Sequence, residues 1–129
     1  GNLAVLELLI EAGCDVNRAN QNGVTPAYAA ALKGHTAALN LLVKAGCDVN
    51  RAEKHGATPA FIAAQEGQTA ALKRLIRAGY DVNRAAKDGA TPAYIAAQEG
   101  QTAALVVLAK AGCDVNQAMK GGATPAFVA

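Results

Sequence analysis

The side chains best suited to metal or redox chemistry are three cysteines, Cys14, Cys47 and Cys113, which stand 33 and 66 residues apart in the sequence. Thiolates bind zinc only where several sulfur or imidazole ligands converge on one centre. The two histidines, His35 and His55, do not share the spacing of the cysteines. Metal or disulfide chemistry therefore depends on whether the elements that carry the sulfurs bring them together.

The residue types needed for catalysis are missing or recur in a repeated pattern. The chain contains no serine, so a Ser–His–Asp triad is impossible, and no Gly-rich phosphate loop is present. Asp48 stands in a motif that recurs identically along the chain, which is typical of an aspartate that stabilises a turn rather than one that transfers protons. The sequence predicts a protein that is not an enzyme and that uses no metal or cofactor.

Composition and charge indicate the type of fold and limit the kinds of partner that the protein can bind. Hydrophobic residues make up 52% of the 129 residues but aromatic residues only 4%, and the large share of alanine favours closely packed helices. The net charge is +2, from 12 basic and 10 acidic groups, so no strong field favours nucleic acid as a partner. No apolar run reaches the roughly 20 residues of a membrane-spanning helix, so we expect no membrane partner.

Two short motifs recur along the whole chain at one period. The tripeptide Asp-Val-Asn begins at Asp15, Asp48, Asp81 and Asp114. The pair Thr-Pro begins at Thr25, Thr58, Thr91 and Thr124, with a glycine two residues before each threonine. Every step is 33 residues. The chain is therefore a tandem array, which must be recognised before any other feature is interpreted.

One unit contains two short helices. Thr91 is a natural N-cap and Pro92 suits the first helical position, so the first helix should run from there to near Gly100. Apolar residues at helical spacing predict a second helix over 102–110. Gly112 supplies the left-handed residue that ends it.

The remainder of the unit is rich in turn-forming residues and forms an extended loop with a tight turn. Both helices are shorter than the roughly 12–15 residues that persist alone in water, so each unit must pack on its neighbours. Counted from the residue that opens each turn, complete units span 20–52, 53–85 and 86–118, with partial units at 1–19 and 119–129.

A unit of this length with Gly-x-Thr-Pro, a helix pair and Ala-Gly-x-Asp-Val-Asn resembles the ankyrin repeat over essentially the whole chain. The resemblance implies an all-α repeat solenoid of antiparallel helix pairs, with hairpin fingers nearly perpendicular to the helices. It also implies a non-catalytic scaffold that binds a protein partner through the fingers and the concave face of the first helices. The partner-binding residues that it implies are Gln21, Asn22, Val24, Leu32, Lys33, Lys54, His55, Ala57, Gln65, Glu66, Lys87, Asp88, Ala90, Gln98 and Glu99.

The chain departs from the family pattern at two places. Where the family has Leu-His after Thr-Pro, this chain has alanine followed by an aromatic residue such as Phe61, and we interpret this as a paired exchange in which the ring fills the space of the leucine. The acidic residue that usually opens the hairpin turn is kept as Glu53 but becomes Asn20, Ala86 and Met119 elsewhere. We therefore expect the finger tips to be less rigid than in typical members.

The remaining polar candidates have both structural and functional interpretations. The cysteines replace an alanine of the family, so we expect small, buried, reduced side chains, as in cytoplasmic proteins. His35 matches the family's helix–helix turn and should be structural. A ladder of Arg18, Arg51 and Arg84 is either a partner-binding row or a solvated row whose aliphatic stems cover the finger base.

The two ends of the array carry apolar residues without a polar capping repeat. These residues are Leu3, Leu6, Leu9 and Ile10 at one end and Ala126, Phe127 and Val128 at the other. One hypothesis is that the chain is a piece of a longer array. The other is that copies stack head to tail into a homo-oligomer or filament, as heterologous contacts that do not close into a ring do.

Overall fold

The computed structural model describes residues 2–13, 15–81 and 83–112. Within these ranges the secondary structure is entirely helical. The helices are α1 (Asn2–Glu11), α2 (Pro26–Lys33), α3 (Thr36–Lys44), α4 (Pro59–Gln65), α5 (Thr69–Arg77), α6 (Pro92–Gln98) and α7 (Thr102–Lys110). The expected all-helical repeat solenoid is confirmed.

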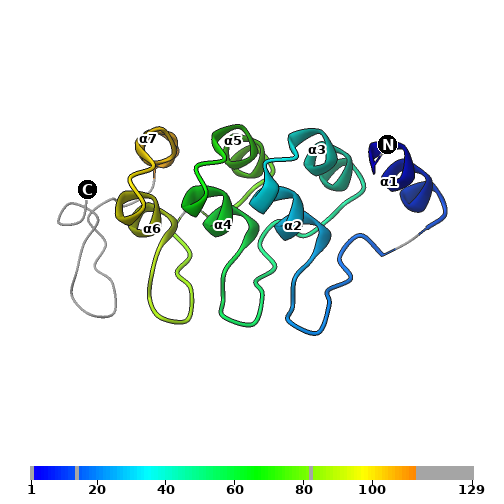
Figure 1. Cartoon of the computed structure of the whole chain (residues 1–129), viewed down its shortest axis with the longest axis horizontal. Coiled ribbons are helices and arrows are strands. Elements are labelled where there is room, and N and C mark those ends of the chain that lie inside the picture. The colour runs from blue at the N-terminus through cyan, green and yellow to red at the C-terminus, as the bar shows by residue number, and fades with distance from the viewer. Residues whose placement is uncertain (1, 14, 82, 113–129) are drawn as a thin grey trace.

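The helices form two parallel rows, and the loops between repeats project from one side (Figure 1). The first helices of the repeats, α2, α4 and α6, make the row beside the projecting loops, and α1, α3, α5 and α7 make the other row. Each first helix packs on the second helix of its own repeat, and α4 also packs on the first helices on either side of it, α2 and α6. Contacts therefore run between neighbouring repeats, as expected of a solenoid.

Each first helix starts at a buried Thr-Pro pair. Thr25, Thr58 and Thr91 have extended backbones, and their hydroxyl oxygens accept from the backbone N–H three residues later at 3.1 to 3.2 Å. Proline follows at the first helical position, where no N–H is needed. The cap predicted at Thr91 is confirmed, as is the second helix over 102–110.

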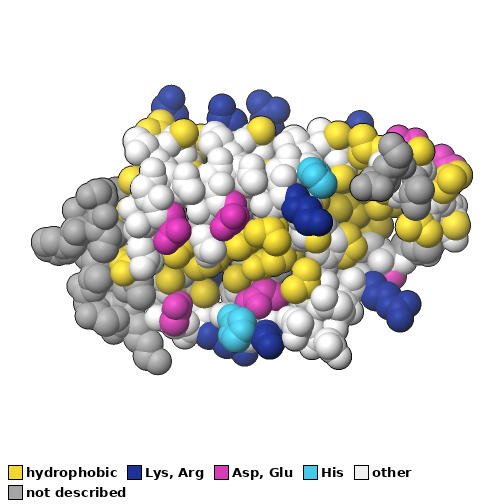
Figure 2. Space-filling view, in the orientation of Figure 1, with side chains coloured by type: hydrophobic (Ala, Val, Ile, Leu, Met, Phe, Trp, Pro, Cys, Tyr) yellow, Lys and Arg dark blue, Asp and Glu magenta, His cyan; other side chains and the backbone are white. Residues whose placement is uncertain are grey.

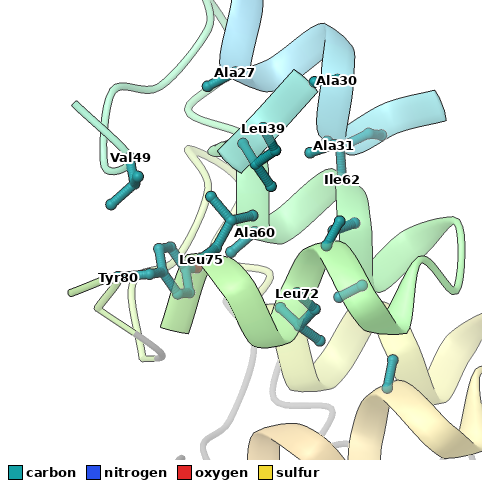
Figure 3. Close-up of a cluster of buried hydrophobic side chains, with 14 of the residues drawn as sticks. Ala27, Ala30, Ala31, Leu39, Val49, Ala60, Ile62, Leu72, Leu75 and Tyr80 are labelled. Atoms are coloured by element: carbon teal, nitrogen blue, oxygen red, sulfur yellow. The ribbon is translucent and has the colours of Figure 1, made fainter. Parts of the chain in front are cut away.

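The core lies between the two rows and alternates large and small side chains. Leu39 and Leu72 of the second helices are fully buried against alanines of the first helices, such as Ala27 and Ala60 (Figure 3). Burial of each leucine contributes about 2 to 3 kcal/mol of hydrophobic free energy. Because alanine has only a methyl group, adjacent first helices approach closely, which explains the alanine-rich composition.

The aromatic residue that follows the first alanine of each first helix is buried to a different degree from repeat to repeat. Successive positions on a helix point about 100° apart, so Ala60, which is 0% exposed, faces the core while Phe61 turns toward the fingers and remains half-buried. Tyr28 in the repeat before is also half-buried, and Tyr94 in the repeat after is buried.

Candidate partner-binding face

The residues that the resemblance assigns to partner binding gather on one side of the molecule. They lie at the tips of the fingers and at the C-terminal ends of the first helices. We call this surface the finger face: Gln21, Asn22, Leu32, Lys33, Lys54, His55, Gln65, Glu66, Lys87, Asp88, Gln98 and Glu99. All are exposed except Gln65, which is half-buried.

The first two finger tips are closed by side-chain acceptors. Asn20 Oδ1 accepts from the N–H groups of Asn22 at 2.8 Å and Val24 at 3.1 Å. In the next finger Glu53 Oε1 accepts from His55 N–H at 2.7 Å and Ala57 N–H at 3.0 Å. Asparagine therefore replaces the acidic residue without loss of these bonds.

The third finger is closed in a different way. Ala86 has no side-chain acceptor, but Asp88 Oδ1 accepts from Ala90 N–H at 2.9 Å. The backbone N–H of Ala86 also donates to the carbonyl of Ala90 at 2.8 Å. Each of the three fingers between residues 20 and 90 therefore has a side-chain hydrogen bond at its tip, and the lower rigidity expected of the tips stays a prediction.

Backbone hydrogen bonds join neighbouring fingers. Lys54 N–H donates to the carbonyl of Asn22 at 2.9 Å, and Lys87 N–H donates to the carbonyl of His55 at 3.0 Å. The same residues carry the exposed side chains of the finger face. Their backbones are therefore held in a fixed register while the side chains remain free to contact a partner.

A groove lies between the second and third fingers. It is lined by His55, Ala57, Phe61, Ala86, Lys87 and Asp88. Ala57 is only 8% exposed and Ala90 only 3%, so both alanines are largely buried at the base of the fingers, where Ala57 forms part of the groove wall. Phe61 was not among the residues predicted to bind a partner. Its position directly after a buried alanine could have indicated that its ring turns away from the core. The groove can accept an apolar side chain beside charged groups.

Apolar and charged side chains occupy separate zones of this side. Figure 2 shows a band of apolar side chains over the first helices, with charged side chains at the finger tips and at the helix ends. The pKa of Tyr28 is raised, first by burial and then by the carboxylates of Glu53 and Glu66 in the next repeat. Its phenol is therefore neutral near pH 7, and the zone between the charges presents aromatic surface.

Two glutamines fix the helix ends of the finger face. Gln68 Nε2 donates to the carbonyl of Leu32 at 3.1 Å, and Gln101 Nε2 donates to the carbonyl of Gln65 at 3.0 Å. Each bond ties the helix–helix turn of one repeat to the first helix of the repeat before. Sequence reasoning missed both glutamines. His35 holds the equivalent place in its repeat, where its backbone N–H donates to the carbonyl of Ala30 and its side chain is exposed.

The arginine ladder is used within the array. Arg51 Nη1 donates to the carbonyl of Asn17 at 2.7 Å, and Arg84 Nη1 donates to the carbonyl of Asn50. The ladder, including the exposed Arg18, therefore lies on the Asp-Val-Asn loops, and its described bonds link one loop to the next. A partner-binding role does not account for these contacts.

The asparagines of the same motif reinforce this link. Asn17 Oδ1 accepts from Asp48 N–H at 2.6 Å, and Asn50 Oδ1 accepts from Asp81 N–H at 3.1 Å. The aspartates stabilise their own turns, since Asp48 Oδ1 accepts from Asn50 N–H at 2.9 Å. The predicted turn role is confirmed for Asp15, Asp48 and Asp81, while Asp114 lies outside the described residues. The inter-repeat role of the asparagines was not predicted.

Among the cysteines, only Cys47 lies within the described residues; Cys14 and Cys113 lie outside them. Cys47 is free and half-buried against the core. Burial raises the pKa of its thiol, Asp48 raises it further and Arg74 opposes the effect. The part of the chain that the structure describes contains no cluster of three or more His, Cys, Asp or Glu side chains that could hold a metal ion.

The residues of the proposed assembly ends are described only at one end. Leu3 and Leu9 of α1 are 40% and 48% exposed, while Leu6 and Ile10 are half-buried. The residues at the other end, Ala126, Phe127 and Val128, lie outside the described ranges. Leu6 packs against the core, so α1 is bound to the array through α3.

Stacked helix pairs with linked fingers define this protein as a repeat solenoid. One family model, described as ankyrin repeats in three copies, matches residues 1–86 and 61–129, and the chain belongs to the ankyrin-repeat family. Repeats of this family generally mediate protein–protein interaction and are typically non-catalytic scaffolds. No curated protein matches the chain. Within the described ranges, no helix combines the length and apolar character needed to cross a membrane.

Proposed function

We propose that this chain is a non-catalytic scaffold that binds a protein partner through the finger face. The observation that carries the proposal is the contrast between buried and exposed positions of the repeat. The buried N-cap position keeps one residue type, at Thr25, Thr58 and Thr91, which are at most 3% exposed. The exposed tip position instead holds Asn22, His55 and Asp88 in successive repeats. Side-chain chemistry therefore varies at this exposed tip position, where the fold does not require one residue type.

The fixed backbone of the finger tips favours binding. A surface that is already ordered before association loses less conformational entropy when a partner docks. The bonds from Lys54 to Asn22 and from Lys87 to His55 hold the tips in that ordered state. The face therefore presents a pattern of side chains rather than a mobile loop.

The chemistry of the face suits a protein surface of mixed character. Lys54 and Lys87 stand at the tips, Glu66 and Glu99 at the helix ends, and Phe61 lines the groove. A polyanion would be repelled by the carboxylates, whereas a protein can match both signs and insert an apolar side chain beside Phe61.

Site-specific photo-cross-linking tests this proposal. We expect a cross-linking amino acid at His55 to capture one defined protein from an extract, and the same group at Lys110 of α7 to capture none. Unlabelled chain should compete, and the Lys54→Glu/Lys87→Glu variant should compete at least about tenfold less well. Equal capture from both positions, or equal competition by the variant, would contradict the proposal.

Head-to-tail stacking of copies is a second candidate function. The supporting observation is that Leu8 and Leu9 of α1 are 65% and 48% exposed, an apolar surface that a further repeat or a second copy could cover. We expect Leu8→Asp/Leu9→Asp to abolish any concentration-dependent assembly seen by sedimentation while the circular dichroism stays helical. A wild-type monomer at high concentration would remove this candidate.

A further inference from the structure

The outer surface between α3 and α5 carries a groove that is separate from the finger face. It is lined by Lys44, Lys73, Arg74 and Arg77, together with Asn40, Thr36 and Ala70, and no carboxylate is among the lining residues. We call this the outer groove. Figure 2 shows Lys and Arg side chains along the edge of the molecule that the second helices form.

The charge of the outer groove departs from the repeat pattern. Lysine or arginine ends α3, α5 and α7, at Lys44, Arg77 and Lys110, where a cation is favourable beside the helix C-terminus, whereas α1 ends at Glu11. Lys73 has no such explanation, because the matching positions one repeat before and after are Asn40 and Val106. Positive charge is therefore concentrated at this one junction beyond what the repeat requires.

One of the arginines is held in place by the neighbouring repeat. Arg74 Nε donates to Asn40 Oδ1 at 2.6 Å, and Arg74 is half-buried, which fixes the plane of its guanidinium group. The matching positions to Arg74 are Leu41 and Val107. A planar guanidinium that is fixed before binding can hold a carboxylate through two parallel hydrogen bonds.

The surroundings of the outer groove limit its length. On one side Lys44 also borders Glu7 and Glu11 of α1. On the other side α7 presents Val106, which is 46% exposed. The cationic stretch therefore covers a single junction between repeats, whereas a nucleic acid is held by positive charge that follows several phosphates. A short acidic segment with an apolar residue beside it fits this arrangement.

We propose that the outer groove binds a short, carboxylate-rich segment of a protein partner. The finger face lies on the loops and first helices, and the outer groove lies on the second helices, so the two surfaces can be occupied at the same time. The binding of the acidic segment does not depend on the function proposed for the finger face.

Fluorescence anisotropy with a short labelled peptide rich in Asp and Glu, with leucines at intervals, tests the outer groove. We expect saturable binding that weakens with salt and that is lost when Asn and Gln replace Asp and Glu in the peptide. Lys73→Glu/Arg77→Glu should weaken binding about tenfold, and Lys73→Asn, which restores the residue type of the preceding repeat, should weaken it severalfold.

The matched control is Lys33→Glu/Lys87→Glu, which makes the same change in net charge on the finger face. We expect it to weaken peptide binding less than about twofold. Equal loss in both double variants would show attraction to net charge alone and overturn the proposal. So would the absence of peptide binding, or tighter binding of single-stranded DNA or phosphatidylserine vesicles with the same response to Lys73→Asn. Circular dichroism of each variant verifies that the repeats remain folded.

Discussion

The Thr58 hydroxyl donates a hydrogen bond to the phenol oxygen of Tyr80 at 3.3 Å, and both side chains are buried. Thr58 caps α4, and Tyr80 lies in the loop after α5, so the bond joins the two ends of one helix pair. Phe61 stands where the resemblance places a histidine, and its ring can neither donate nor accept a bond of this kind. The buried Thr58 hydroxyl finds its partner instead in the loop after α5.

Replacement of Tyr80 by phenylalanine should lower the free energy of unfolding by about 1 kcal/mol, because a buried hydroxyl loses its partner. Urea denaturation followed by circular dichroism measures this change. Tyr28→Phe is the matched control, since Tyr28 is only half-buried and its hydroxyl makes no hydrogen bond within the described ranges. We expect the control to stay within about 0.5 kcal/mol of the wild type. Equal effects of the two replacements would contradict this role of Tyr80.

The same tyrosine should make stability depend on alkaline pH. Burial raises the pKa of Tyr80 from 10.0 to about 12, and the hydrogen bond from Thr58 only partly opposes this. The unfolded chain releases the proton first, so stability falls as the pH rises from about 10 to about 12, by up to about 3 kcal/mol. Denaturation at a series of pH values measures the slope, which should be smaller in Tyr80→Phe. An unchanged slope in the variant would assign the effect to other groups.

Alanine at Gly34 should cost more stability than alanine at Gly46. Both glycines have positive φ, 72° and 90°, so alanine costs about 1 kcal/mol of backbone strain at either site. At Gly34 the added methyl group also meets the end of the Gln68 side chain, whereas at Gly46 nothing lies within 4 Å. Displacement of Gln68 removes its bond to Leu32, which adds about 1 kcal/mol. Thermal denaturation of both variants measures the difference, and equal midpoints would exclude the glutamine contact as a source of stability.

Asn50→Ala should destabilise the array by about 1 to 2 kcal/mol, because Asn50 bonds Asp81 N–H at 3.1 Å and the Gly79 carbonyl at 3.5 Å. Asn22→Ala is the control, since the bonds that Asn22 makes within and between fingers come from its backbone N–H and carbonyl, which alanine keeps. We expect the control to change stability by less than about 0.5 kcal/mol. Chemical denaturation of both proteins separates the two outcomes, and similar losses would argue against a loop-to-loop link.

Deletion of 53–85 should leave a shorter helical stack with a lower denaturation midpoint, because one repeat and one interface are lost while the 33-residue phase is kept. Lys87 then follows the preceding repeat as Lys54 does now, facing the carbonyl of Asn22. Deletion of 53–80 breaks the phase and should abolish cooperative unfolding. An unfolded circular dichroism spectrum for the in-phase deletion would contradict the proposed repeat units.

Local sequence signals were sufficient for the helices, but they did not identify the contacts between repeats. Thr91 and the apolar spacing over 102–110 predicted helix bounds because caps and periodicity act within one turn. Gln68, by contrast, bonds a carbonyl 36 residues earlier, and Asn17 bonds a backbone N–H 31 residues later. A polar residue whose partner is a backbone atom of another repeat has no local pattern.

The same contrast between local signals and contacts between repeats applies to the candidate site. The resemblance placed the exposed tips, such as His55, but not Phe61, whose direction depends on how adjacent helices pack. It also gave no indication of the outer groove, because Lys73 and Arg74 on one helix are typical of a solvated face until Asn40 of the preceding repeat is seen beside them.

The reach of the links between repeats determines how the array should respond to mechanical force. Within the described ranges, the hydrogen bonds that join repeats span 29 to 36 residues, and none skips a repeat. A pulling force applied at the two termini is therefore carried by the junctions in series, each loaded equally. We expect such an array to unfold one repeat at a time under load. A partner bound across two fingers would stabilise the junction between their repeats against the same force.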